Sequence, residues 1–98
     1  MEILSVIVIY RPPNNNWLKL ADCLKQYSRV VLIMNDNLHR ETDHENYKLM
    51  NKGTAGAYNY VINNFDFDYL WLWDQDSYVQ PSEIENFLKF TEFPSISL

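Results

Sequence analysis

Apolar residues in this chain gather into short continuous runs separated by polar segments. Runs rich in β-branched or aromatic residues at positions 3–10, 30–34 and 69–73 predict buried strands, and residues 47–50 predict a shorter one. The run at 69–73 has a bulky residue at every position, which is typical of a strand covered on both faces. Most of the segments between these runs carry helical periodicity or turn-forming residues.

Three segments predict helices. The first follows the turn- and cap-forming residues Asn14, Asn15 and Asn16. Its apolar positions are Trp17, Leu20, Ala21, Leu24 and Tyr27. The second helix follows Gly53, and its predicted apolar face consists of Ala57, Tyr58, Val61, Ile62 and Phe65. The third begins at Pro81, where Ser82 and Glu85 have the spacing of a capping box.

Strands that alternate with helices predict an α/β fold with right-handed parallel crossovers. We expect one domain over residues 1–98, built as a Rossmann-like open sheet of about four mainly parallel strands with helices on both faces. Numbered along the chain, the strands are expected in the order 3-2-1-4, which reverses beside the first strand. The polar clusters at 10–11, 35–36, 51–53 and 74–76 then meet at one edge of the sheet.

Charge and composition narrow the function. The net charge is −5 and no basic stripe is present, so we expect no nucleic-acid partner. Cys23 is the only cysteine, which excludes an intrachain disulfide and a Cys-based zinc site. The run at 3–10 is too short to span a bilayer, and Glu2 stands where a signal peptide needs a basic residue. We therefore expect a cytoplasmic protein with no transmembrane segment.

Asp74 and Asp76 directly follow the last predicted strand, at the edge where open α/β sheets bind ligands. If the chain stays extended there, the alternation of a strand points both carboxylates the same way. Paired carboxylates suit Mg²⁺ or Mn²⁺, which usually arrive with a substrate diphosphate. The alternative is a solvated turn. The closely spaced Gly53 and Gly56 indicate a place where the backbone approaches another group.

Four segments have a distinctive order. They are Val6-Ile7-Val8-Ile9-Tyr10-Arg11-Pro12, Met34-Asn35-Asp36-Asn37, Asn51-Lys52-Gly53-Thr54-Ala55-Gly56-Ala57-Tyr58-Asn59, and Leu72-Trp73-Asp74-Gln75-Asp76-Ser77 with Pro81 beyond it. Together they resemble the N-terminal half of a GT-A fold, family 2 type glycosyltransferase, nearest to the rhamnosyltransferase-like branch. The likeness covers residues 3 to about 90. Arg11 departs from it, since the family usually has Asn there.

The resemblance implies a nucleotide-sugar donor site for a UDP- or dTDP-sugar. In such a site Tyr10 lies near the base, and Asp36 contacts the base or ribose. The register leaves Asn35 as the alternative to Asp36. Gly53 and Gly56 let the start of the helix approach the nucleotide, and a helix start favours an anion in any case.

The resemblance also implies a metal site and a limit on activity. Asp74 contacts the ribose or the metal, and Asp76 holds Mg²⁺ or Mn²⁺, which bridges the diphosphate and stabilises it as it leaves. The general base and the acceptor site of the family lie well beyond this motif. Only a short segment follows Asp76 here, so we assign no catalytic residue. We expect a truncated donor-binding half with little or no transferase activity alone.

Two alternatives stay open. A haloacid-dehalogenase-like phosphatase also has a strand followed by Asp-x-Asp, but its motif requires Thr or Val where Tyr78 stands. A non-catalytic interaction module or remnant is the other. The strand at 69–73 would then form a sheet edge with Trp71 and Trp73 partly uncovered, which favours a homodimer or docking to a separate acceptor half.

Overall fold

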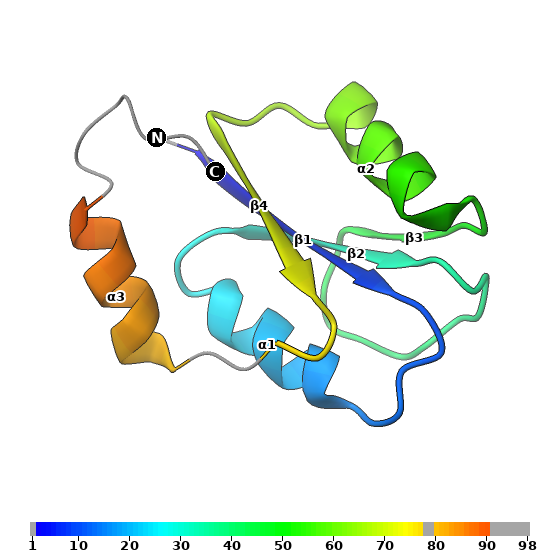
Figure 1. Ribbon diagram of the computed structural model, residues 1–98, viewed down its shortest axis with the longest axis horizontal. Helices are drawn as coiled ribbons and strands as arrows, with labels where there is room; N and C mark the ends of the chain where they lie inside the picture. The colour runs from blue at the N-terminus through cyan, green and yellow to red at the C-terminus, as the bar shows by residue number, and fades with distance from the viewer. Residues whose placement is uncertain (1, 78–79, 91–98) are drawn as a thin grey trace.

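The computed structural model describes residues 2–77 and 80–90, and its elements follow the predicted order (Figure 1). Each strand boundary lies within one residue of its predicted position. The elements are β1 (Ile3–Ile9), α1 (Asn16–Leu24), β2 (Arg29–Met34), β3 (Tyr47–Leu49), α2 (Gly53–Asn64), β4 (Tyr69–Asp74) and α3 (Pro81–Phe90).

The four strands form one sheet in the order β3-β2-β1-β4, and every neighbouring pair is parallel. The predicted α/β architecture and strand order are therefore confirmed. β1 lies between two partners, with Val6 opposite Val31 on β2 and opposite Leu72 on β4. Because parallel strands share one direction, the chain leaves all four of them at the same edge, here called the carboxyl edge.

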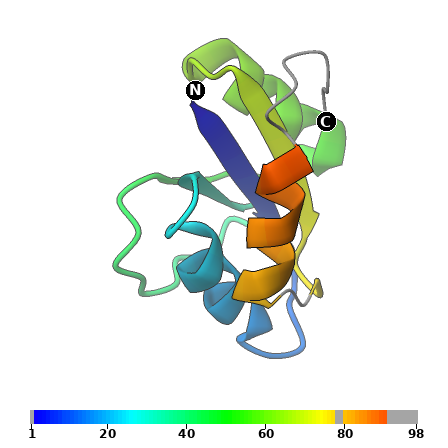
Figure 2. The same cartoon turned by 90° about the vertical axis from the view of Figure 1, so that its left-hand side faces the viewer.

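One face of the sheet is covered by α1 and α3, which lie next to each other in Figure 2. Trp17 and Leu24 of α1 and Ile84 of α3 pack there against strand residues. The buried residues of this core are Ile3, Ile7, Ile9, Trp17, Leu20, Ala21, Leu24, Val30, Leu32, Met34, Trp71 and Ile84. The periodicity of the first predicted helix is confirmed by this packing.

The opposite face is covered by α2. Its buried residues are Leu4, Val6, Val31, Ile33, Ala57 and Val61. Tyr58 and Phe65 pack against them, but Ile62 is 52% exposed, so its predicted place on the buried face is wrong. Ala57 and Val61 stack one turn apart, and Ile62 lies about 100° further round the helix from Val61, beyond the contact with the sheet.

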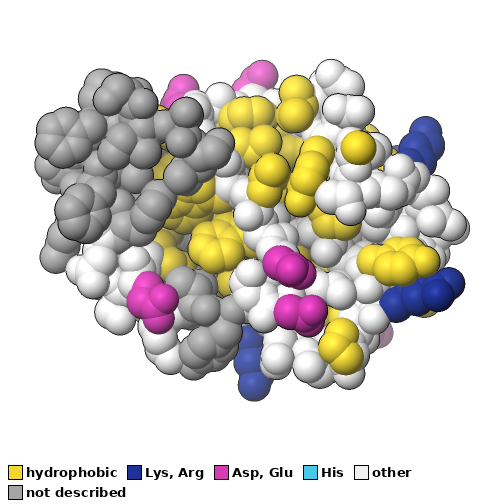
Figure 3. Space-filling model, in the orientation of Figure 1, with side chains coloured by type: hydrophobic (Ala, Val, Ile, Leu, Met, Phe, Trp, Pro, Cys, Tyr) yellow, Lys and Arg dark blue, Asp and Glu magenta, His cyan; other side chains and the backbone are white. Residues whose placement is uncertain are grey.

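β4 is one of the two edge strands of the sheet, the other being β3, and its two faces differ in how far they are covered. Trp71 is 5% exposed because it packs with Ile84, so the expectation of a partly uncovered Trp71 is wrong. Trp73 is half-buried, in edge-to-face contact with Trp71. Leu72 points to the α2 face and is 49% exposed, so β4 is not covered on both faces. Figure 3 shows apolar side chains gathered over β4 and neighbouring α2.

The helix starts differ from the predicted caps. Asn15 precedes α1 without a side-chain cap, although Asn14 Oδ1 accepts the Asn16 N–H at 2.9 Å. α3 begins at Pro81, where the missing N–H is no loss, so Ser82 lies inside the helix and the capping box is wrong. Among the residues that the structure describes, no helix combines the length and apolar character needed to cross a bilayer.

A chain of hydroxyl hydrogen bonds ties β1 to the turn after α1. Ser5 is fully buried, and its Oγ lies 2.7 Å from Ser28 Oγ. Ser28 Oγ donates in turn to the Leu24 carbonyl at 3.0 Å. Since a hydroxyl carries one hydrogen, Ser5 is the donor to Ser28.

Ser28→Ala should lower the free energy of unfolding by about 1–3 kcal/mol, because it leaves the buried Ser5 hydroxyl without its acceptor. Ser5→Ala should cost less, since Ser28 keeps its bond to Leu24. The double variant should be more stable than Ser28→Ala alone. Urea unfolding of the three variants measures these differences, and a Ser28→Ala variant no less stable than Ser5→Ala would contradict the assignment of the donor.

Candidate functional site

Four segments meet at the carboxyl edge. Residues 10–15 follow β1, residues 35–37 follow β2, residues 50–52 lead from β3 into α2, and residues 75–77 follow β4. The order reverses beside β1, whose neighbours β2 and β4 continue in opposite directions across the sheet. Open α/β sheets bind their ligands at such a reversal. The parallel topology thus brings together the segments that carry the predicted site residues.

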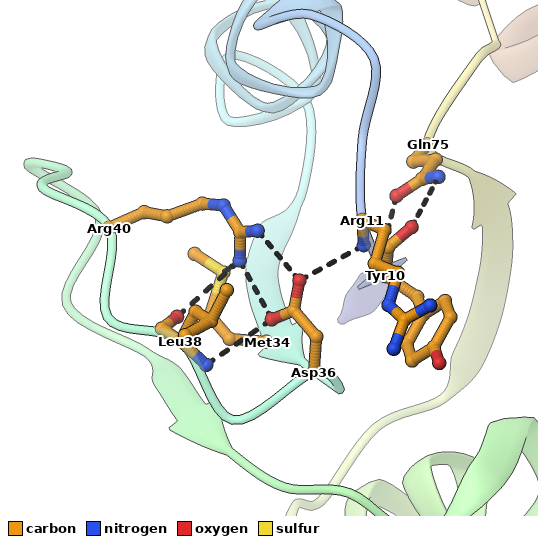
Figure 4. Close-up of polar contacts among 7 residues, drawn as sticks. All are labelled: Tyr10, Arg11, Met34, Asp36, Leu38, Arg40 and Gln75. Atoms are coloured by element: carbon orange, nitrogen blue, oxygen red, sulfur yellow. Dashed lines mark hydrogen bonds and ion pairs between the residues drawn. The ribbon is translucent and has the colours of Figure 1, made fainter.

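Side-chain hydrogen bonds join these segments to one another (Figure 4). Gln75 contacts the backbone of Tyr10, which links the ends of β4 and β1. Asp36 accepts the Arg11 N–H at 2.9 Å, which links the ends of β2 and β1. Asn35 Oδ1 accepts the Lys52 N–H at 3.3 Å, which links β2 to the start of α2. The carboxyl edge is therefore a connected network.

The Gln75 side-chain amide forms hydrogen bonds with the backbone of Tyr10 where the strand pairing has ended. Pairing between β1 and β4 ends with Val8 opposite Asp74. Beyond it, Gln75 Oε1 accepts the Tyr10 N–H at 2.8 Å, and Gln75 Nε2 donates to the Tyr10 carbonyl at 3.0 Å. An amide offers both a donor and an acceptor, as strand backbone does. The backbone just past β1 is thus still hydrogen-bonded to the segment after β4, although the strand pairing has ended.

Asp74 and Asp76 lie on that turn. Asp74 is the last residue of β4, its carbonyl accepts the Ser77 N–H at 3.0 Å, and its Oδ1 accepts the Asp76 N–H at 3.3 Å. The chain does not stay extended past Asp74, so strand alternation does not place Asp76. Both residues are exposed.

The donor set at this turn fits a metal that arrives with its own ligands. Within residues 2–77 and 80–90, no three His, Cys, Asp or Glu side chains gather closely enough to hold a metal alone. Mg²⁺ is usually held by one or two carboxylates, with phosphates and waters completing its shell. Asp74 and Asp76 match that partial set.

Tyr10 and Asp74 lie on the same face of the sheet. Val8 packs into the core under α2, and Tyr10 follows it by two positions. Asp74 stands directly opposite Val8 and follows Leu70, which packs into the same core, by four positions. Since side chains alternate along a strand, Asp74 belongs to the face on which α2 begins. Tyr10 lies one residue past β1, and Figure 4 shows its ring directed toward the side on which α2 lies. Tyr10 is 46% exposed there.

The Asp36 carboxylate is surrounded by donors. Arg40 Nη2 lies 2.6 Å from Oδ2 and Arg40 Nη1 lies 2.9 Å from Oδ1. The Arg11 and Leu38 N–H groups donate to Oδ2 and Oδ1. The Arg40 guanidinium, and then these N–H groups, hold the pKa of Asp36 well below its usual range, although burial opposes them. A base or ribose contact by Asp36 requires one of these donors to give way.

Asn35, the alternative to Asp36, is 3% exposed and bonded to Lys52. The Asp36 side chain is itself only 4% exposed, so the structure does not choose between the two residues. Arg40 was not predicted to belong to the site. The only signal in the sequence is its position four residues after Asp36 in an otherwise polar segment.

The local structure explains why glycine stands at positions 53 and 56. Gly53 has a φ of +73°, a left-handed conformation that favours glycine, and a Cβ added there would meet no atom within 4 Å. A Cβ on Gly56 would lie 2.7 Å from Lys52 Cβ. The close approach expected from this pair is therefore made by the Lys52 side chain at Gly56. Approach of a nucleotide to the start of α2 stays a prediction.

No protein-family model, curated protein or solved structure matches this chain. Its function is therefore inferred from the carboxyl edge itself. Tyr10, Asp36, Asp74 and Asp76 lie at or just past the carboxyl ends of β1, β2 and β4, whereas Gly53 and Gly56 lie in the first turn of α2, which follows β3.

Gly56→Ala should lower the free energy of unfolding by about 1 kcal/mol or more. Alanine normally favours a helix over glycine by about 1 kcal/mol, but the added Cβ meets Lys52 Cβ and forces a local shift. The same substitution in a Lys52→Gly background, which lacks that atom, should be neutral or stabilising. Thermal unfolding of the four chains measures the coupling, and an equal effect in both backgrounds would rule out the contact.

The stability of the protein should fall in acid partly through Asp36. Its pKa is lower in the folded state than in the unfolded chain, where an Asp titrates near pH 4. As the pH drops below about 4, the unfolded state binds the proton first, so the stabilisation present at neutral pH is progressively lost. Urea unfolding at pH 7 and pH 3 should show a larger loss in wild type than in Asp36→Asn. The exposed Asp66→Asn is the control and should behave as wild type.

Proposed function

We propose that this domain binds the nucleoside diphosphate part of a nucleotide-sugar at its carboxyl edge, as the donor-binding half of a GT-A glycosyltransferase does. A UDP- or dTDP-sugar is the proposed donor, with Mg²⁺ or Mn²⁺. The observation that carries the proposal is the hydrogen-bonded network of the carboxyl edge, which joins the ends of β1, β2 and β4 and the start of α2 beside the reversal in strand order.

The nucleoside and phosphate ends of the ligand meet different chemistry on this face. The exposed Tyr10 ring is available for stacking on a base. The first turn of α2 has no side-chain cap and no acidic residue, so its N–H groups and the helix dipole favour a phosphate. Gly53 leaves open space beside that turn.

Asp74 and Asp76 are the residues that would hold the metal. A divalent cation bound there supplies positive charge to the diphosphate, which the two exposed carboxylates alone would repel. The function proposed is binding of the donor. No catalytic residue is assigned among residues 2–77 and 80–90.

A second candidate, an interaction module, is favoured by one observation. Leu72 is 49% exposed on β4, and β4 has a strand partner on one side only within the described part of the chain. An apolar edge strand of this kind favours association with another chain, either a second copy or an acceptor-binding polypeptide.

Titration with UDP, dTDP and GDP, each with and without Mg²⁺, followed by NMR, tests the donor site. Metal-dependent shifts should cluster at residues 10, 36, 53 and 74–76, and Mn²⁺ should broaden the same signals. Asp76→Ala should weaken binding in Mg²⁺ about tenfold or more, since it removes a metal ligand. Asp66→Ala, an exposed Asp before β4 at the opposite edge, should bind as wild type.

If none of the three nucleotides shifts the wild-type spectrum at millimolar concentration, the donor site is wrong. Self-association that rises with concentration and is lost in Leu72→Ser would then support the interaction module.

A further inference from the structure

Arg11 holds a backbone conformation that a residue other than glycine rarely adopts. Its φ is +43°, in the left-handed region. A side chain there strains the backbone, and the strain persists only where the surroundings fix the conformation. Such positions are concentrated at ligand-binding sites, so Arg11 merits a functional explanation.

Side chains from both neighbouring strands fix this conformation. Asp36, itself locked by Arg40, accepts the Arg11 N–H at 2.9 Å. Gln75 binds both the N–H and the carbonyl of Tyr10. Three consecutive backbone polar groups at the end of β1 are thus held by side chains that follow β2 and β4 (Figure 4). The backbone of residues 10 and 11 is fixed before any ligand arrives.

The two side chains presented there form a cation–aromatic pair. The Arg11 guanidinium lies 5.1 Å from the centroid of the Tyr10 ring, and both residues are exposed. Arg29 and Arg40, by contrast, are paired with the carboxylates of Glu2 and Asp36. Arg11 makes no ion pair with any carboxylate in residues 2–77 and 80–90. Its guanidinium is free to bind an anion.

We propose that Arg11 binds a phosphate group of the nucleotide directly and so gives the site an affinity for nucleoside diphosphates that does not depend on metal. This inference rests on the proposed function. A guanidinium matches the oxygens of a phosphate in charge and geometry. The metal at Asp74 and Asp76 would then strengthen a binding mode that Arg11 already supports.

Affinities of UDP, dTDP and GDP, and of the matching nucleosides uridine, thymidine and guanosine, test this by NMR in EDTA and in Mg²⁺. In EDTA, Arg11→Gln should weaken the nucleoside diphosphate about tenfold or more, the loss of one charge-assisted contact. Nucleoside affinity should be unchanged, because no phosphate is present. Arg11→Lys should recover part of the loss.

Two further variants distinguish the loss of the Arg11 charge from a loss of stability or of any arginine. Arg11→Gly removes the guanidinium and relieves the positive φ, so it should fold at least as stably as wild type and still lose the metal-independent affinity. Arg29→Gln is the matched control, since Arg29 also lies over an aromatic ring, 5.3 Å from the centroid of Phe65, but at the opposite edge of the sheet. It should bind as wild type.

The outcomes are distinct. Wild type that binds the diphosphates in Mg²⁺ but not in EDTA overturns the role of Arg11 and leaves the donor site standing. Equal affinity of wild type, Arg11→Gln and Arg11→Gly in EDTA does the same. Wild type that binds in neither condition overturns both proposals.

Discussion

The parallel pairing of β1 on both of its sides is the constraint on which the rest of the structure depends. It places β1 between β2 and β4, with Val6 opposite Val31 and Leu72, so β1 is buried under α2 on one face and under α1 and α3 on the other. It also sends the chain out of β1, β2 and β4 at one edge. If β1, β2 or β4 ran antiparallel to the other two, Tyr10, Asp36 and Asp74 would lie at two different edges.

The pairing of β1 with β4 ends before the chain leaves the sheet, which leaves backbone groups without a strand partner. β1 continues past the last pair with β4, so the backbone groups of Tyr10 and Arg11 need partners that no strand supplies. Tyr10 and Arg11 are exposed, so water could also bind these groups, but the Gln75 amide and the Asp36 carboxylate bind them in fixed positions. The residues that complete the sheet therefore also fix the relative positions of the segments that carry the candidate site.

Most of the fold could be predicted from the sequence because its signals are local. Continuous apolar runs mark the strands, and their alternation with helical segments fixes the parallel crossovers. Burial of individual side chains was less predictable. The exposure of Leu72 and Ile62 and the burial of Trp71 depend on which element covers which face, and that is decided by tertiary packing.

The candidate site was predictable only in outline. Its residues converge because of the topology, which the sequence patterns indicate. The contacts within it could not be predicted, because a bond such as Gln75 to Tyr10 joins positions 65 residues apart and leaves no periodic signal. Pairing of Arg40 with Asp36 had the same difficulty, since a polar segment of irregular structure does not reveal which of its side chains fold back.

The charges of the carboxyl edge bear on the ligand proposed for it. Asp36 is neutralised by its bidentate pair with Arg40. The remaining charged side chains of the four converging segments are Arg11, Lys52 and Asp76, and Asp74 lies directly before them at the end of β4. Two cations therefore stand against two carboxylates. An anion alone meets two carboxylates, and a metal ion alone meets two cations. A diphosphate with its metal presents both signs, so it gains from each group and is repelled by none when its charges are placed opposite theirs. Under the proposed function, balanced charges of this kind would favour the metal–nucleotide pair over either component, even though the protein as a whole carries a negative charge.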